Sequence, residues 1–260
     1  MTVTVACGFA REPNRTLRVK CQRETVGAEA VKQPDGNIRV IVAQNGPYMV
    51  TGDVRLSEQV IATGSDGSSE AWIERDLPPA GPRYALCRCG HSSKKPFCDG
   101  THTKIGFDGT EVADRAPFVG RAKTFDGPSL ALLDVESLCA FARFCDPNGQ
   151  VWSQIAETND PAVRATFIRQ VQNCPSGRLV AWDKQRGAAL EPELAPSIGL
   201  IEDPAEACSG PIWLRGGIAL IAADGTEYEV RNRVTLCRCG ESKNKPFCDG
   251  AHAAIKFHAK

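Results

Sequence analysis

Cysteine and histidine residues recur in one pattern at two places in the chain. The first set is Cys87, Cys89, Cys98 and His102, and the second, at the same spacings, is Cys237, Cys239, Cys248 and His252. In each set two thiols separated by one residue come from an extended segment, and the histidine lies one helical turn after the third cysteine. Thiolate and imidazole are ligands that soft transition metals prefer. The pattern therefore predicts two metal-containing sites, with four ligands converging at each.

The residues around these ligands agree in both copies as well. Each copy has Cys-Arg-Cys-Gly, a serine, Lys-Pro-Phe and a closing Cys-Asp-Gly. An aspartate followed by glycine suits a helix start, because the carboxylate caps free N–H groups and glycine lets the backbone approach a cluster closely.

Both stretches resemble the CDGSH iron-sulfur proteins, the NEET family, over about sixteen residues each. The resemblance implies one 2Fe-2S cluster on each set of three cysteines and one histidine. Zinc is the alternative, since three cysteines and one histidine also suit tetrahedral zinc. A neutral imidazole in place of a thiolate raises the cluster potential, and protons compete with iron for it, so acid favours cluster release.

Composition limits the possible partners. The chain has 260 residues, 42% of them hydrophobic, and its 31 basic residues balance its 31 acidic ones. A chain without a basic field is not expected to bind nucleic acid or an anionic membrane surface. The sequence lacks a signal peptide and any apolar run of the roughly 18 residues that a membrane span needs, so we expect a cytoplasmic protein. Its twelve cysteines are then expected to bind metal rather than to form disulfides.

An internal repeat predicts the fold class. Residues 46–54 read GPYMVTGDV and residues 210–218 read GPIWLRGGI, and each segment precedes one cysteine motif. Short runs of β-branched and aromatic residues separated by glycine turns are typical of small antiparallel sheets. In the second copy we expect a meander of 212–222, 227–230 and 233–236. The prediction is an α+β chain with two pseudo-symmetric β-rich CDGSH modules, paired about an approximate twofold axis so that a monomer is complete.

Between the copies the pattern favours helix. Apolar residues at 130, 133, 138 and 141 predict a first helix, and Asp160-Pro161 suits the start of a second one. Val163, Phe167 and Val171 share one face of that second helix. We therefore expect three parts: residues 1–126 with the first module, a small helical ferredoxin-like insert at 127–189, and residues 190–260 with the second module.

Three further cysteines lie in the insert: Cys139, Cys145 and Cys174, the last followed by proline. Bacterial ferredoxins present Cys-x2-Cys-x2-Cys and a distant Cys-Pro, but here Ala142 occupies the middle position. The insert resembles single-cluster ferredoxins and divergent 4Fe-4S mono-cluster domains, and its three thiolates suit a 3Fe-4S cluster. A 4Fe-4S cluster would need a fourth ligand, for which Cys7, Cys21 and Cys208 are candidates. Alternatively the three cysteines are buried core residues.

These sites predict one-electron transfer, with redox proteins such as a reductase or a ferredoxin as partners. Storage of clusters and their transfer to apo iron-sulfur proteins is the alternative, because the histidine ligand is labile. We expect no enzyme and no catalytic residue, since the chain has no dinucleotide fingerprint, HExxH motif or nucleophile elbow. If the cysteine sites held zinc, the remaining hypothesis would be a zinc-organised interaction module.

Overall fold

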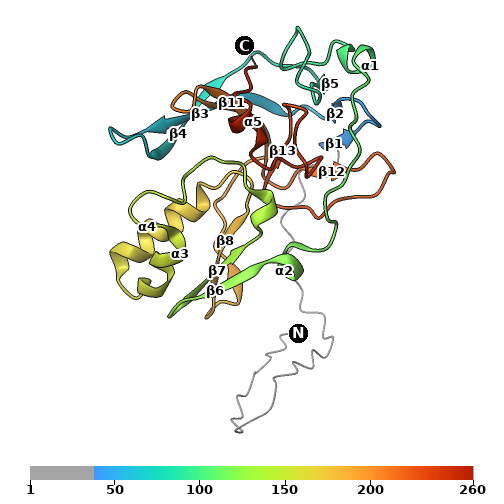
Figure 1. The fold of residues 1–260 in the computed structure, drawn as a ribbon. Helices are drawn as coiled ribbons and strands as arrows, with labels where there is room; N and C mark the ends of the chain where they lie inside the picture. Colours follow the sequence, from blue (N-terminus) through green and yellow to red (C-terminus); the bar gives the residue numbers. More distant parts are fainter. Residues whose placement is uncertain (1–37, 260) are drawn as a thin grey trace. The chain divides into compact units, whose positions relative to one another are not determined.

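The computed structural model describes residues 38–259, which belong to one compact unit (Figure 1). Cys7 and Cys21, with the rest of the predicted N-terminal segment, lie outside the described residues. The strands are β1 (Arg39–Val42), β2 (Tyr48–Thr51), β3 (Arg55–Thr63), β4 (Ser69–Asp76), β5 (Arg83–Leu86), β6 (Lys123–Asp126), β7 (Leu130–Asp134), β8 (Leu179–Asp183), β9 (Ala188–Ala189), β10 (Ser197–Asp203), β11 (Cys208–Arg215), β12 (Ala219–Ile221) and β13 (Arg233–Leu236). The helices are α1 (Thr101–Lys104), α2 (Phe118–Arg121), α3 (Val151–Gln154), α4 (Pro161–Gln172) and α5 (Ala251–Ala254), with 3₁₀ turns at Glu136–Leu138 and Ile155–Glu157.

The strands form three sheets, so the described chain is β-rich with few helices. The first sheet has the order β12-β1-β2-β5, and the second has the order β13-β11-β10-β3-β4. A third, which we call the insert sheet, has the order β6-β7-β8-β9. The first two sheets carry the two cysteine motifs, because β5 and β13 each end directly before a Cys-x-Cys segment.

Each motif-bearing sheet takes a strand from the other copy. Strand β12 of the second copy pairs in parallel with β1, and β3 of the first copy pairs in parallel with β10. The expected meander within the second copy is therefore wrong. Residues 219–221 leave their own copy to complete the other sheet, and 227–230 makes only an isolated bridge between Ile221 and Glu227.

One hydrophobic core serves both copies. It joins residues of the first copy, such as Val40, Tyr48 and Leu56, to residues of the second, such as Ile212 and Leu220. All of these side chains are buried. Because their main core is shared, the two β-rich regions form one body.

The first predicted helix of the insert is wrong. Residues Leu130–Asp134 form β7, the central strand of the insert sheet, which pairs antiparallel with β6 and β8. A strand covered on both faces carries a continuous apolar run, which can be read as one face of a helix. The insert is thus a sheet with helices α3 and α4 on one side, as Figure 1 shows, rather than a helical module.

The second predicted helix is confirmed as α4. The Asp160 carboxylate accepts hydrogen bonds from the backbone N–H groups of Ala162 (2.7 Å) and Val163 (3.2 Å), and Pro161 begins the helix. Phe167 and Val171 are fully buried against the insert sheet. None of the helices in the described part of the chain has the length and apolar character needed to cross a membrane.

A buried arginine joins β13 to the insert. The Arg233 guanidinium is inaccessible to solvent and donates hydrogen bonds to the carbonyls of Val171 (2.7 Å), Cys174 (2.7 Å) and Leu179 (3.1 Å). Its charge is balanced by Glu191 at 2.6 Å. Burial alone would raise the pKa of Glu191, but Arg233 outweighs that effect and the pKa is lowered. The insert is therefore held against the second copy by a charged contact.

Replacing Arg233 with methionine should destabilise the protein by about 3–5 kcal/mol, since three buried carbonyls lose their donor and the partly exposed Glu191 loses its cationic partner. Chemical denaturation followed by circular dichroism measures the change. The equivalent residue of the first copy, Arg83, is exposed, and Arg83→Met is the matched control with little expected effect. Equal losses in the two variants would contradict the role assigned to Arg233.

Candidate iron-sulfur sites

The predicted ligands of each CDGSH-like motif lie together as two pairs. In the first site, Cys87 Sγ and Cys89 Sγ are 3.8 Å apart, and Cys98 Sγ is 3.3 Å from His102 Nδ1. In the second site, made of Cys237, Cys239, Cys248 and His252, the corresponding distances are 3.7 Å and 3.4 Å. The two sites thus repeat one local geometry.

Backbone hydrogen bonds bring the two halves of each motif together. In the first motif the N–H of Cys87 donates to the Pro96 carbonyl at 2.8 Å, and the N–H of Cys98 donates to the Ala85 carbonyl at 2.9 Å. The second motif repeats both bonds, from Cys237 and from Cys248, at 2.9 Å. The loop between the ligand pairs therefore returns beside the strand from which it left.

The Asp-Gly pair places the last two ligands. Asp99 Oδ1 accepts the N–H of Thr101, the first residue of α1, at 3.0 Å, which confirms the predicted helix start. Gly100 has φ of 86°, a conformation that side chains disfavour. Its N–H donates to Cys98 Sγ at 3.4 Å, a hydrogen bond that stabilises negative charge on the sulfur. Gly250 does the same for Cys248.

The ligands of each CDGSH-like site form two pairs rather than one group around a single point. Among residues 38–259, no three His, Cys, Asp or Glu side chains gather closely enough to hold one metal ion. One pair in each site is two thiols, and the other pair is a thiol and an imidazole.

Burial and neighbouring thiols shift the pKa values of several predicted ligands. Burial raises the pKa of Cys89 to about 11 and raises that of Cys248, and repulsion from neighbouring thiolates adds to both shifts. The hydrogen bond between the thiols of the second site lowers the pKa of Cys237 to about 6 and raises that of Cys239. Burial lowers the pKa of His252 to about 4, so its ring is neutral and able to coordinate. Closely spaced thiolates of this kind are stabilised by metal cations.

The arginine inside each Cys-Arg-Cys segment anchors the motif to the protein. Arg238 is buried and donates to the carbonyls of Gly210 (2.6 Å) and Ile201 (2.7 Å) and to Glu202 Oε1 (2.9 Å). Arg88 is equally buried, contacts the Gly109 carbonyl and lies with its guanidinium carbon 5.5 Å from the Tyr48 ring centre.

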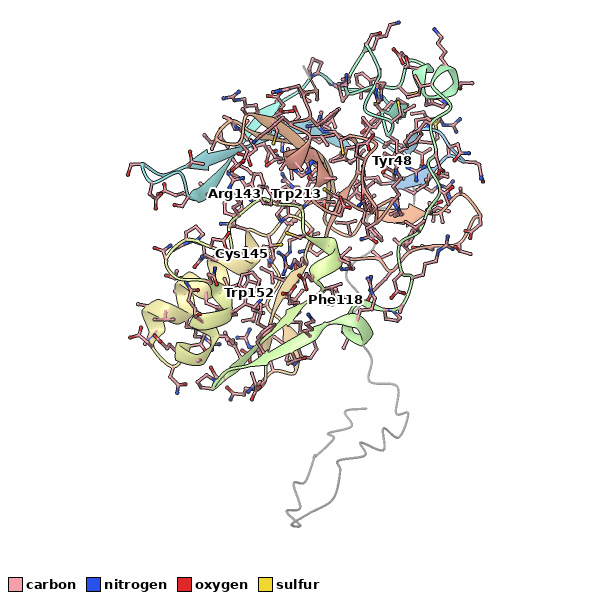
Figure 2. All side chains as sticks on the ribbon, in the orientation of Figure 1. Tyr48, Phe118, Arg143, Cys145, Trp152 and Trp213 are labelled. Atoms are coloured by element: carbon pink, nitrogen blue, oxygen red, sulfur yellow. The ribbon has the colours of Figure 1, made fainter. Side chains whose placement is uncertain are left out.

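The two sites adjoin through their Cys-x-Cys segments. A side-chain carbon placed on Gly90 would lie 2.3 Å from the Cys239 carbonyl oxygen, and one on Gly240 would lie 2.6 Å from that of Cys89. Only glycine permits such an approach of two backbones. Tyr48, labelled in Figure 2, is fully buried and donates its hydroxyl to the Cys237 carbonyl at 2.8 Å, which further connects the copies.

The three cysteines of the insert line one cavity. Cys139, Cys145 and Cys174 surround it together with Ala142 and Arg178. Burial raises the pKa of Cys145 to about 12, with repulsion from Asp146 and from the other two thiols adding to the shift. The fourth-ligand candidate Cys208 does not line this cavity. It is buried at the start of β11. Burial and the charge of Asp203 raise the pKa of its thiol, and Lys256 opposes that shift.

Arg178 brings positive charge to the insert cavity. It forms a two-pronged ion pair with Asp134, at 2.6 Å and 2.9 Å, and Asp134 also accepts the Trp152 indole N–H at 3.0 Å. Burial opposes the charge, but hydrogen bonds to Asp134 and to the Cys139 side chain outweigh it and raise the pKa of Arg178. The guanidinium is thus held charged beside a cysteine of this site.

Comparison with protein families agrees with this geometry. The family described as iron-binding zinc finger, CDGSH type, matches residues 45–103 and 209–253. A family described as divergent 4Fe-4S mono-cluster matches residues 125–184, between the two regions. The chain is an iron-sulfur protein with two CDGSH regions and an inserted mono-cluster domain. No curated protein matches it in sequence. The predicted resemblance is thereby confirmed, whereas the three-part division at 126 and 189 and the individual ligand assignments stay predictions.

Sequence reasoning missed the buried cations and the tyrosine around the sites of this CDGSH protein. Arg88 and Arg238 had a signal, because arginine stands between the paired cysteines in both copies. No sequence signal pointed to Arg178, Arg233 or Tyr48, since their partners are distant in the sequence.

Replacing Arg178 with glutamine should lower the reduction potential of the cluster in the insert, because the reduced form loses a nearby positive charge. Loss of the insert cluster to a chelator should also become about 10-fold faster. Potentiometric titration followed by EPR measures the first effect. Arg186→Gln, at an exposed residue of the turn after β8, is the control. An unchanged potential in Arg178→Gln would contradict the electrostatic role.

Proposed function

We propose that this iron-sulfur protein transfers single electrons between redox proteins and is a carrier rather than an enzyme. Bound iron-sulfur clusters supply reversible one-electron chemistry. The observation that supports the proposal is the contiguity of three sites in one chain. The backbones of Gly90 and Cys239 meet between the CDGSH sites, and the Cys139 carbonyl lies 3.4 Å from a side-chain position on Gly250.

The proposed cofactors are two 2Fe-2S clusters and one 3Fe-4S cluster. The paired ligands of the first and second sites support the former. The insert site offers three thiols around one cavity, and Ala142 lines that cavity at the position where ferredoxins have their middle cysteine. A 4Fe-4S cluster is the alternative, and it requires a fourth ligand.

The proposed form is a monomer with internal approximate twofold symmetry, acting in the cytoplasm. Support for the symmetry comes from the reciprocal pairing of β12 with β1 and of β3 with β10. Within each sheet the strand that borders the motif, β5 or β13, has an equivalent neighbour, β2 or β11. The ten described cysteines are free thiols, as cluster ligands in a reducing compartment should be.

Electron transfer is tested on protein purified without oxygen. Iron and sulfide analysis should give seven irons per chain for two 2Fe-2S clusters and one 3Fe-4S cluster, or eight if the insert holds 4Fe-4S. Stoichiometric reductant should bleach the visible absorption, and a one-electron haem protein should restore it while the iron content stays constant. A colourless protein that contains zinc, or a reduced protein that passes no electron to any one-electron acceptor, would contradict the proposal.

Cluster donation is a second candidate, favoured by the partial exposure of Cys98 and His102 in the first site. Incubation of the loaded protein with an apo-ferredoxin should then move clusters, which the absorption and activity of the acceptor report. His102→Cys and His252→Cys replace the labile ligand and should slow transfer by about 10-fold or more. Transfer at an unchanged rate in both variants would count against donation.

A further inference from the structure

The two CDGSH sites have the same ligands but different access to solvent. In the first motif Cys98 and His102 are partly exposed, and Phe97 is 36% exposed. In the second motif the equivalent residues are buried, with Phe247 at 7% and His252 at 4% exposure. Every predicted ligand of the second site is at most 5% exposed. The difference therefore comes from the surroundings of the motifs and not from the motifs themselves.

The insert covers the second motif through several contacts. Asn244 Nδ2 donates to the Ser137 carbonyl at 2.8 Å. The Cys139 carbonyl oxygen and Phe141 Cβ both lie 3.4 Å from a side-chain position on Gly250, next to the helix that carries the histidine. All three insert residues belong to the segment that leads into the insert site.

A buried ion pair holds the same segment in place. Arg143, labelled in Figure 2, donates to both carboxylate oxygens of Asp203 on β10, at 2.5 Å and 3.1 Å. The Asp203 side chain is 3% exposed. The contact between the insert and the second site is therefore anchored, because breaking the pair would leave a buried carboxylate without its charged partner.

The first motif has no such cover in the described part of the chain. Gly100 occupies the position equivalent to Gly250, and none of the described residues comes within 4 Å of a side-chain position on it. Lys94, equivalent to Asn244, is exposed. The insert, a single copy in a duplicated chain, can cover only one of the two motifs.

We infer that the second CDGSH site is an internal site enclosed by the insert, and that exchange with molecules outside the chain takes place at the first CDGSH site and at the insert site. The three insert cysteines are each partly exposed, so the insert site is accessible to solvent independently of the first CDGSH site. The insert site contacts the second CDGSH site, and the second CDGSH site contacts the first. The role of the sites in electron exchange rests on the proposed function. The enclosure of the second site can be measured on the loaded protein alone.

The first experiment follows cluster loss to an excess of a soluble iron chelator, by visible absorption at constant pH. The 2Fe-2S absorption should be lost in two phases, the faster from the first site and the slower from the second. His102→Cys should slow the fast phase alone, which assigns it. The double variant Asn244→Ala/Phe141→Gly removes the hydrogen bond to Ser137 and the Phe141 Cβ contact with Gly250, and it should speed the slow phase by about 10-fold. Lys94→Ala, at the matched position of the open motif, should leave both phases unchanged.

A second measurement needs no variant. A soluble paramagnetic chelate, added to the reduced wild-type protein, should enhance the EPR relaxation of the CDGSH signal assigned to the first site and leave that of the second site nearly unchanged. A single release phase, equal relaxation enhancement of both signals, or a slow phase that is unaffected by removing the cover would overturn the inference. A protein that shows one accessible and one protected site but passes electrons to no partner would keep the enclosure and reject the proposed function, so the two failures are distinguishable.

Discussion

The reciprocal pairing of β12 with β1 and of β3 with β10 is the constraint on which the rest of this structure depends. Without this pairing β1 and β10 would be edge strands of their sheets, with a row of free N–H and C=O groups. Exchanging one strand in each direction pairs these groups inside the chain and merges two small cores into one. It also brings the Gly90 and Gly240 loops into backbone contact, so the two cluster sites adjoin because the sheets are interlocked.

Buried and partly buried arginines position the predicted sites on this scaffold. Arg88 and Arg238 hold the Cys-x-Cys segments, Arg233 joins the insert to β13, and Arg178 brings positive charge to the insert cysteines. A guanidinium can donate to several carbonyls at once and stays charged when buried. It can therefore satisfy the loop backbone beside a cluster and at the same time offset the negative charge that thiolate ligands bring.

The insert breaks the equivalence of the two CDGSH regions. Two motifs of nearly identical sequence differ in exposure because one of them packs against residues 137–143 and the other does not. The reduction potential and lability of a cluster depend on solvent access and on nearby charge as well as on its ligands. Duplication followed by insertion can thus yield two sites with one ligand set and separate roles.

The sequence by itself determined the features that depend on neighbouring residues. The Asp160 cap on α4 and the hydrogen bond that Asp99 accepts at the start of α1 follow from short spacings, because hydrogen bonds within one turn need no distant partner. Two expectations were wrong: the run at Leu130–Asp134 is a central strand, and the meander of the second copy gives up β12 to the other sheet. Both depend on which distant strands pair, and local patterns carry no information on that choice. Only the tertiary structure decided the contact between the two sites and the cover over His252, because burial is a property of the packed chain and not of the motif.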